Sequence, residues 1–232
     1  MNDAMQGKDI IASRTRDKII LDGKLTEPAW KKAAVIDGFR TIVDGKPRNA
    51  ASNTSVRVLW DEEFLYVGAE MEDEDIIALH TENNSKTWED DVFEVFIKPF
   101  KNKPGYYEFH VTPRNTTLQL YFPKAEVKRK LENSIFEGNI RTAVQVRGKI
   151  NNRDMKDDGW TAEIAVPFSA FGDTAPPPEP GAEWTAAFCR YDYTHNPGAD
   201  GENSKELSSS AAFKELNFHR FEDYNKLIFL DR

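Results

Sequence analysis

Hydrophobic and polar residues alternate in many short stretches of this chain, and a period of two is typical of β-strands. The clearest case is residues 160–166, where Trp160, Ala162, Ile164 and Val166 share one side. The short connector 61–63 between two such stretches favours a hairpin. The pattern predicts strands over residues 55–60, 64–71, 91–98, 106–112, 117–122, 140–147, 160–166, 184–193 and 224–230.

Helical patterns are scarce. Residues 28–33 suit one short helix with Pro28 near its start, and residues 167–171 suit a single turn. Two stretches rich in turn-forming residues, 175–181 and 195–210, predict loops. Many short strands with little helix predict an all-β fold, a two-sheet antiparallel β-sandwich of the immunoglobulin-like or jelly-roll-like kind with one or two short helices.

The length of the chain suits one such domain. Its 232 residues can form a single sandwich, with residues 1–17 as an N-terminal arm or edge strand and residues 18–232 as the domain. Trp30, Trp60, Trp160 and Trp184 are expected in the core. Trp88 differs because it follows a polar stretch and precedes three acidic residues.

Charge excludes some partners. The formal net charge is −8 and no basic block offsets it, so nucleic-acid binding is not expected. No apolar run approaches the roughly 18 residues of a membrane-spanning helix. Residues 1–7 lack the apolar core of a signal peptide, and the sequence alone leaves the compartment open.

The chain has a single cysteine, Cys189, which excludes disulfides within the chain and zinc sites made of cysteine pairs. Cys189 lies among apolar residues and is expected to be a buried, inert thiol.

Several local patterns follow one another in a recognisable order. They are Leu21-Asp22-Gly23 leading to Pro28-Ala29-Trp30, then residues 54–67, Trp88 to Ile97, Tyr106 to Phe109, Gly159 to Phe168, Trp184 to Arg190, Phe218 to Phe221, and Lys226 to Phe229. Together they resemble the family 9 carbohydrate-binding modules and their stand-alone relatives over residues 19–230. The resemblance implies a non-catalytic β-sandwich that binds a mono- or oligosaccharide between aromatic side chains, an extracytoplasmic location, and structural calcium, with no organic cofactor.

The resemblance also implies site residues. Trp88 matches the stacking position, and a flat ring suits the apolar face of a sugar. Glu94, six residues later, matches an acidic sugar contact, while Arg114 and Asn115 resemble the family's basic and amide contacts. We expect Glu94 and Arg114 to form a pair that orients a neutral or acidic sugar; a purely structural Glu–Arg pair is the alternative.

Alternation extends this expected surface. His110, and Gln119 on the next strand, are predicted to share one polar face with Glu94 and Arg114, although an ordinary solvated face explains the same pattern. Relatives often carry a Trp-Ser-Pro where this chain has Leu207 to Ser209. We expect Tyr191 or Tyr193, with Arg190, to replace the missing aromatic wall. A protein-interaction module without sugar affinity remains an alternative.

Some of these residues, and other acidic and sulfur-containing ones, also suit metal, catalytic or haem chemistry. Acidic residues at Asp73, Asp75 and Asp90 have the oxygen ligands that calcium prefers, without a diagnostic spacing. Glu94 and Glu108 could form the carboxylate pair of a glycoside hydrolase, but no nucleophile, phosphate-binding or zinc-protease motif accompanies them. A haem b protein is a further alternative, with Met71 and either His80 or His110 as axial ligands.

Overall fold

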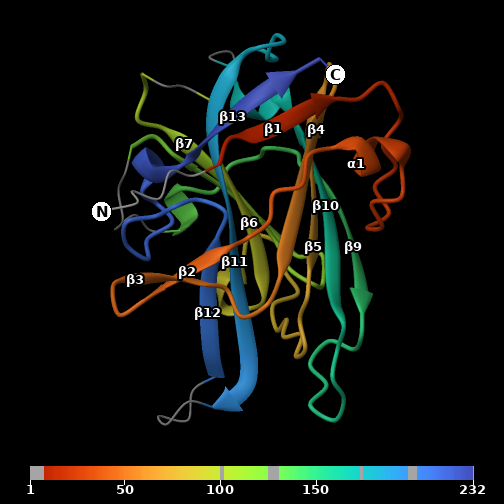
Figure 1. Ribbon diagram of the computed structural model, residues 1–232, viewed down its shortest axis with the longest axis vertical. Helices are drawn as coiled ribbons and strands as arrows, with labels where there is room; N and C mark the ends of the chain where they lie inside the picture. Colours follow the sequence, from red (N-terminus) through yellow and green to blue (C-terminus); the bar gives the residue numbers. More distant parts are fainter. Residues whose placement is uncertain (1–7, 100–101, 125–130, 173–174, 198–202, 232) are drawn as a thin grey trace.

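The computed structural model describes residues 8–99, 102–124, 131–172, 175–197 and 203–231, and it is a β-sandwich (Figure 1). The described strands are β1 (Ile10–Arg14), β2 (Arg40–Val43), β3 (Lys46–Asn49), β4 (Thr54–Trp60), β5 (Phe64–Met71), β6 (Val92–Lys98), β7 (Tyr106–Val111), β8 (Thr117–Phe122), β9 (Arg141–Arg147), β10 (Gly159–Pro167), β11 (Glu183–Pro197), β12 (Asn203–Ser209) and β13 (Asn225–Leu230). The helices are α1 (Pro28–Lys32) and four single 3₁₀ turns, η1 (Thr87–Glu89), η2 (Leu131–Asn133), η3 (Phe168–Phe171) and η4 (Phe221–Asp223).

The long strand β11 joins the two sheets. On one edge it pairs with β6. On the other edge its first residues pair with β13 and its later residues pair with β12. The first sheet therefore runs β9-β10-β5-β4-β1-β13, and the second runs β8-β7-β6-β11-β12-β2-β3. The predicted two-sheet sandwich is confirmed, and Figure 1 shows β12 beside the lower half of β11.

The main hydrophobic core lies between the two sheets. Val58, Val67 and Ile164 of the first sheet face Val95 and Phe109 of the second, and all five are buried. Trp60 and Trp184 pack edge-on against Phe229 in this core. Trp160 is also buried here, so three of the four expected core tryptophans fill the space between the sheets.

The fourth, Trp30, lies on the outer face of the first sheet. It comes from α1 and packs on Leu59 and Tyr66. Beneath it, the fully buried Glu163 of β10 accepts hydrogen bonds from the Trp30 indole and from the backbone N–H groups of Asp22 and Gly23. This carboxylate explains why the Asp22-Gly23 and Trp30 patterns occur together with Gly159–Phe168.

Segments after β12 and β8 cover part of the outer face of the second sheet. Phe213, Phe218 and Tyr224 pack on Phe96 and Tyr106 in a separate hydrophobic cluster. On the other side, Tyr121 donates its backbone N–H to the Ser134 carbonyl close to η2. The part of the outer face that these segments leave uncovered forms the floor of a cavity.

The N-terminal segment is not an edge strand. Although the sequence predicts an arm or edge strand over residues 1–17, β1 lies between β13 and β4 and is parallel to both (Figure 1). Ile10 and Ala12 are fully buried, and this burial explains the interior position. Residues 1–7 lie outside the described part.

Three strands depart from the hydrophobic pattern. β2 and β3 form a short, largely exposed hairpin, and β12 lies within the stretch predicted as a loop over 195–210. β12 is held by its backbone pairing with β11 rather than by alternation of its side chains. Among the described residues, no helix is both long and apolar enough to cross a membrane.

Candidate ligand-binding site

A cavity of about 420 Å³ opens on the outer face of the second sheet. Its volume falls within the usual range for small-molecule sites. The described lining combines apolar and aromatic side chains with a few polar groups: Trp88, Glu94, Phe96, Glu108, His110, Leu120, Phe122, Leu131, Ser134, Tyr191, Leu207, Leu216, Asn217, Phe218 and His219.

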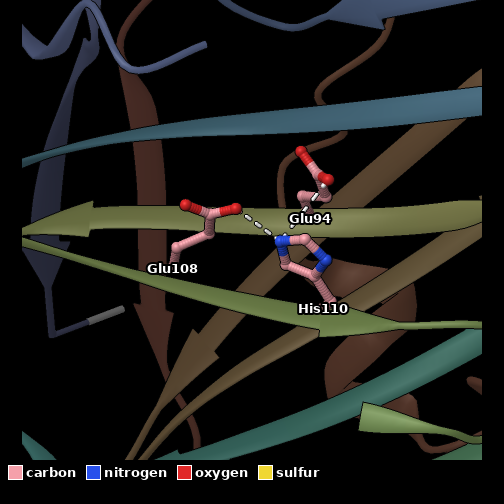
Figure 2. A group of neighbouring side chains, drawn as sticks. All are labelled: Glu94, Glu108 and His110. Atoms are coloured by element: carbon pink, nitrogen blue, oxygen red, sulfur yellow. Dashed lines mark hydrogen bonds and ion pairs between the residues drawn. The ribbon is translucent and has the colours of Figure 1, made fainter. Parts of the chain in front are cut away.

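Three buried ionisable side chains from neighbouring strands form the floor of this cavity. Glu94 on β6 lies opposite His110 on β7, and Glu108 precedes His110 by two residues on the same face. His110 Nε2 is 2.5 Å from Glu108 Oε1 and 3.4 Å from Glu94 Oε1. Figure 2 shows the imidazole between the two carboxylates. Each of the three side chains is buried.

Burial and mutual charge set the protonation of this group. Burial raises the pKa of the Glu94 carboxyl to about 8; the charge of His110 opposes the shift and that of Glu108 adds to it. Burial alone would lower the pKa of His110, but the charges of Glu94 and Glu108 outweigh it and the pKa is raised. The titrations of Glu94 and His110 are therefore coupled to one another.

The turn η1 positions both the wall and the floor of the cavity. Trp88, half-buried, lines the cavity, while the adjacent Thr87 is fully buried with its Oγ1 2.8 Å from His110 Nδ1. The Tyr193 hydroxyl donates to the Trp88 carbonyl. Consecutive residues of one short turn thus place a ring at the rim and fix the imidazole below it.

The two acids after this turn hold the backbone around it. Both oxygens of Asp90 accept backbone N–H groups, from Leu79 and His80. Those of Asp91 accept from Ile77 and Tyr193. Both side chains are fully buried, so this part of the acidic run is structural.

Three of the expected polar contacts do not line the cavity. Gln119 lies opposite Phe109, and it therefore faces the inner side of the sheet, away from His110. Arg114 lies beyond the end of β7, where its Nε donates to the Ala78 carbonyl 2.7 Å away. The predicted Glu94–Arg114 pair is therefore wrong, and His110 occupies the place next to Glu94. Asn115, exposed in the same turn, donates to the Thr142 carbonyl.

The aromatic and basic residues expected from β11 divide between the two faces. Tyr191 lines the cavity, and its ring packs edge-on against Phe218. Arg190 points the other way and is buried against Asp73 and Asp192, so it is not a cavity residue. The Tyr193 hydroxyl donates its hydrogen bond to the Trp88 carbonyl, as described above.

The acids expected to bind calcium do not converge. One oxygen from each of Asp73, Asp91 and Asp192 lies within 4.8 Å of the others, but Arg190 already forms ion pairs with Asp73 and Asp192. Asp75 donates its backbone N–H to Asp73, and Asp90 is occupied by the backbone. These acids therefore do not form a set of six to eight free oxygen ligands such as calcium prefers. Calcium binding stays a prediction.

The haem alternative conflicts with the fold. Met71 is buried between the sheets, whereas His110 points to the outer face of the second sheet. The imidazole of His80 contacts Asp90 and Glu89. Cys189 is buried as predicted, and burial raises the pKa of its thiol well above the ordinary value.

Sequence reasoning missed the part of the lining contributed by residues 216–219. Asn217, Phe218 and His219 approach the sheet from the segment after β12. His219 Nδ1 lies 2.8 Å from the Tyr106 hydroxyl. The available signal was the Phe218-His219 pattern, which the resemblance includes without assigning a role.

Comparison with known proteins agrees with this geometry. The family model described as "Carbohydrate family 9 binding domain-like" matches residues 20–189. The chain belongs to this family. The family 9 domain is 36% identical over 89 residues to endo-1,4-beta-xylanase A of Thermotoga maritima, covering 38% of this chain and 8% of the xylanase. It is 27% identical over 149 residues to endo-1,4-beta-xylanase C of Paenibacillus barcinonensis, covering 62% and 13%.

Solved structures show the same fold. A family 9 carbohydrate-binding module from Caldicellulosiruptor kristjanssonii in complex with cellotriose matches with a TM-score of 0.62 and 14% identity, over 97% of this chain and 95% of that one. The glucose complex gives a TM-score of 0.63 at the same identity, over 97% of both chains. The family 9 domain described here spans less than a fifth of the curated xylanases that it matches.

Proposed function

We propose that this family 9 domain binds a carbohydrate without catalysis, in the cavity on the outer face of the second sheet. The observation that carries the proposal is the combination of a half-buried Trp88 at the rim with buried Glu94, Glu108 and His110 on the floor. A sugar ring offers an apolar face to the indole and hydroxyl groups to buried acceptors and donors. Cellotriose and glucose occupy structures of the same fold.

The lining favours a neutral sugar over an acidic one. Two carboxylates lie on the floor, and none of the described lining residues is lysine or arginine. A sugar carboxylate would therefore be buried there without a lysine or arginine partner, which is costly. Tyr191, on the strand next to β6, and Phe218 supply further aromatic surface to the cavity, although Leu207 is smaller than the tryptophan implied at its place. We therefore expect a dissociation constant of roughly 0.1–1 mM for the best sugar.

Binding fits the floor better than hydrolysis does. Glycoside hydrolases hold two carboxyl groups about 5–9.5 Å apart on either side of the scissile bond. Here an oxygen of Glu94 and one of Glu108 lie within 4.8 Å of one another and of His110, which contacts both. The relatives suggest a role beside glycan-degrading activities and an extracytoplasmic location for the whole polypeptide. We expect no release of reducing sugar from the best ligand.

Truncation of Trp88 tests the proposed function. Screening on a glycan array identifies a sugar, and titration calorimetry measures its affinity for the wild type and for Trp88→Ala. We expect a loss of about tenfold or more, because the loss of ring stacking adds about 1 kcal/mol to the loss of burial. Phe64→Ala, on the outer face of the first sheet, is the matched control and should bind as the wild type does.

Two results would contradict the proposal. Trp88→Ala could bind as tightly as the wild type while remaining folded, which would place the sugar elsewhere. Alternatively, no glycan could bind at millimolar concentration, which would favour the interaction module that has lost sugar affinity.

A gain of affinity provides a second prediction. Leu207 is half-buried and lines the cavity at the place where relatives often carry tryptophan. Leu207→Trp should restore the missing wall and tighten sugar binding by about threefold to tenfold, since an aromatic contact contributes about 0.5–1.5 kcal/mol. Calorimetry with the same sugar measures the change, and Ile20→Trp, at an exposed position outside the cavity lining, should leave the affinity unchanged. Unchanged or weaker binding by a folded Leu207→Trp variant would contradict a wall at this position.

A further inference from the structure

The floor of the cavity places three metal-ligating atoms together. Glu94, Glu108 and His110 each offer one such atom, and these atoms lie within 4.8 Å of one another. Two ligands about 2.1 Å from one tetrahedral ion lie about 3.4 Å apart. Glu94 Oε1 and His110 Nε2 already have a separation of 3.4 Å. Glu108 would need only to draw back from the imidazole.

One oxygen on this floor lacks a partner. Glu108 Oε2 is buried and accepts no hydrogen bond from the described residues, and the residue is 4% exposed. His219 Nδ1 lies 3.8 Å from this oxygen, beyond hydrogen-bond distance, and is charged only when protonated. Leaving a buried carboxylate oxygen unpaired is costly, and a bound cation would satisfy it.

The imidazole is also held in a suitable orientation. Thr87 Oγ1 lies 2.8 Å from His110 Nδ1 on the side away from the carboxylates. With Nδ1–H donating to this hydroxyl, the lone pair of Nε2 points at Glu94 and Glu108. Histidine ligands of metals are commonly fixed in this way by a hydrogen bond at the other ring nitrogen.

The types and number of ligands indicate which class of metal ion would bind and how many coordination positions would stay free. Two carboxylates and one imidazole suit divalent transition metals better than calcium or magnesium, which prefer oxygen alone. Three protein ligands leave a further coordination position, and all three side chains line the cavity.

We propose that Glu94, Glu108 and His110 bind a divalent transition-metal ion of the zinc class, whose open position accepts a hydroxyl group of the bound sugar. The second half of this proposal rests on the proposed function, whereas the first half does not. The cavity would then recognise its ligand partly by metal coordination.

Titration of the chelator-stripped full chain with Zn²⁺ alone tests the metal site. We expect one equivalent to bind, and Co²⁺ to give the visible absorption of a low-coordinate site. Glu108→Gln and His110→Asn should each weaken Zn²⁺ binding by at least about 100-fold, and Thr87→Val by about 10- to 100-fold. His80→Asn, outside the cavity, should not change it. Circular dichroism checks that each variant is folded, and Glu108→Gln keeps the size of the side chain if His110→Asn unfolds.

The outcomes separate the two proposals. The metal site is wrong if the wild type binds no Zn²⁺, or if Glu108→Gln and His110→Asn bind it as the wild type does. Sugar binding that is equal in chelator and in Zn²⁺ overturns metal coordination of the sugar and leaves the proposed function intact. Stoichiometric Zn²⁺ binding without affinity for any glycan contradicts the proposed function and the coordination of a sugar hydroxyl, and it leaves the metal site intact. A Ca²⁺ titration in parallel tests the calcium prediction, and preference for Ca²⁺ at this floor would overturn the zinc-class assignment.

Discussion

Replacing Arg190 by methionine is expected to lower the free energy of unfolding by about 3–5 kcal/mol, as removal of one partner from a buried ion pair does. The guanidinium is 1% exposed and lies 3.2 Å from Asp73 and 3.1 Å from Asp192. Its Nη1 also donates to Thr54 across to the first sheet. Without Arg190, these buried carboxylates would repel one another at an end of the sandwich.

The loss should depend on pH in a defined direction. Burial raises the pKa of Asp73 to about 6, while Arg190 opposes the shift. A raised carboxyl pKa stabilises the fold at pH values below the ordinary value of 3.8, and this contribution disappears as the pH rises through about 6. Removing Arg190 raises the pKa further. The difference between variant and wild type should therefore shrink as the pH is lowered from 7 towards about 4.

Urea unfolding at several pH values measures this prediction. The matched control is Arg57→Met, because Arg57 pairs with the exposed Glu70 across two strands of the first sheet. An ion pair of that kind contributes about 0–1 kcal/mol. Equal losses for the two variants, or a loss for Arg190→Met that does not change with pH, would show that the Arg190 ion pair is not what stabilises this end.

Replacing Glu163 by alanine is the second large effect that we expect. The carboxylate accepts three hydrogen bonds, from the N–H groups of Asp22, Gly23 and the Trp30 indole. Each donor left unpaired in a buried site costs about 1–3 kcal/mol. We therefore expect the free energy of unfolding to fall by about 3–5 kcal/mol, with the turn at Gly23 and helix α1 loosened from the sheet.

Two further variants separate charge from shape at this position. Glu163→Gln keeps acceptor capacity and should cost less than Glu163→Ala. Glu70→Ala, exposed on the neighbouring strand β5, should lie within about 0.5 kcal/mol of the wild type in the same urea experiment. A decrease in the free energy of unfolding below 1 kcal/mol for Glu163→Ala would mean that water replaces the carboxylate and that its three hydrogen bonds add little to stability.

Strand register decided which site residues could be predicted from the sequence. Alternation within β7 puts Glu108 and His110 on one face, as the structure has them. Alternation does not determine which side chains of one strand share a face with those of the next strand, because a register shift of one residue reverses the faces. Gln119 lies opposite Phe109 rather than His110. A hydrophobic pattern alone therefore could not assign Gln119 to the inner face.

The fold was more predictable than the cavity walls. Nine strands and one short helix follow from local patterns, since each strand places its own apolar residues in a core. β12 and the segment over residues 216–219 lack such a pattern and are positioned by contacts with distant strands. Likewise, Asp90 and Asp91 belong to an acidic run in the sequence, and local pattern does not predict their burial. In the fold, the backbone N–H groups of Ile77 and Leu79 donate to them.

The position of β1 has a consequence for how the chain folds. Ile10 pairs with Leu227, and Ala12 pairs with Val58 on the other edge of the same strand. One seam of the first sheet thus joins segments from near opposite ends of the described chain, which gives the fold a high contact order. All-β domains of this kind usually fold in milliseconds to seconds. During synthesis, β1 and β4 emerge long before β13 does, so one edge of the growing sheet stays open until the last strand arrives, and this edge is where a stalled or truncated chain would associate with another.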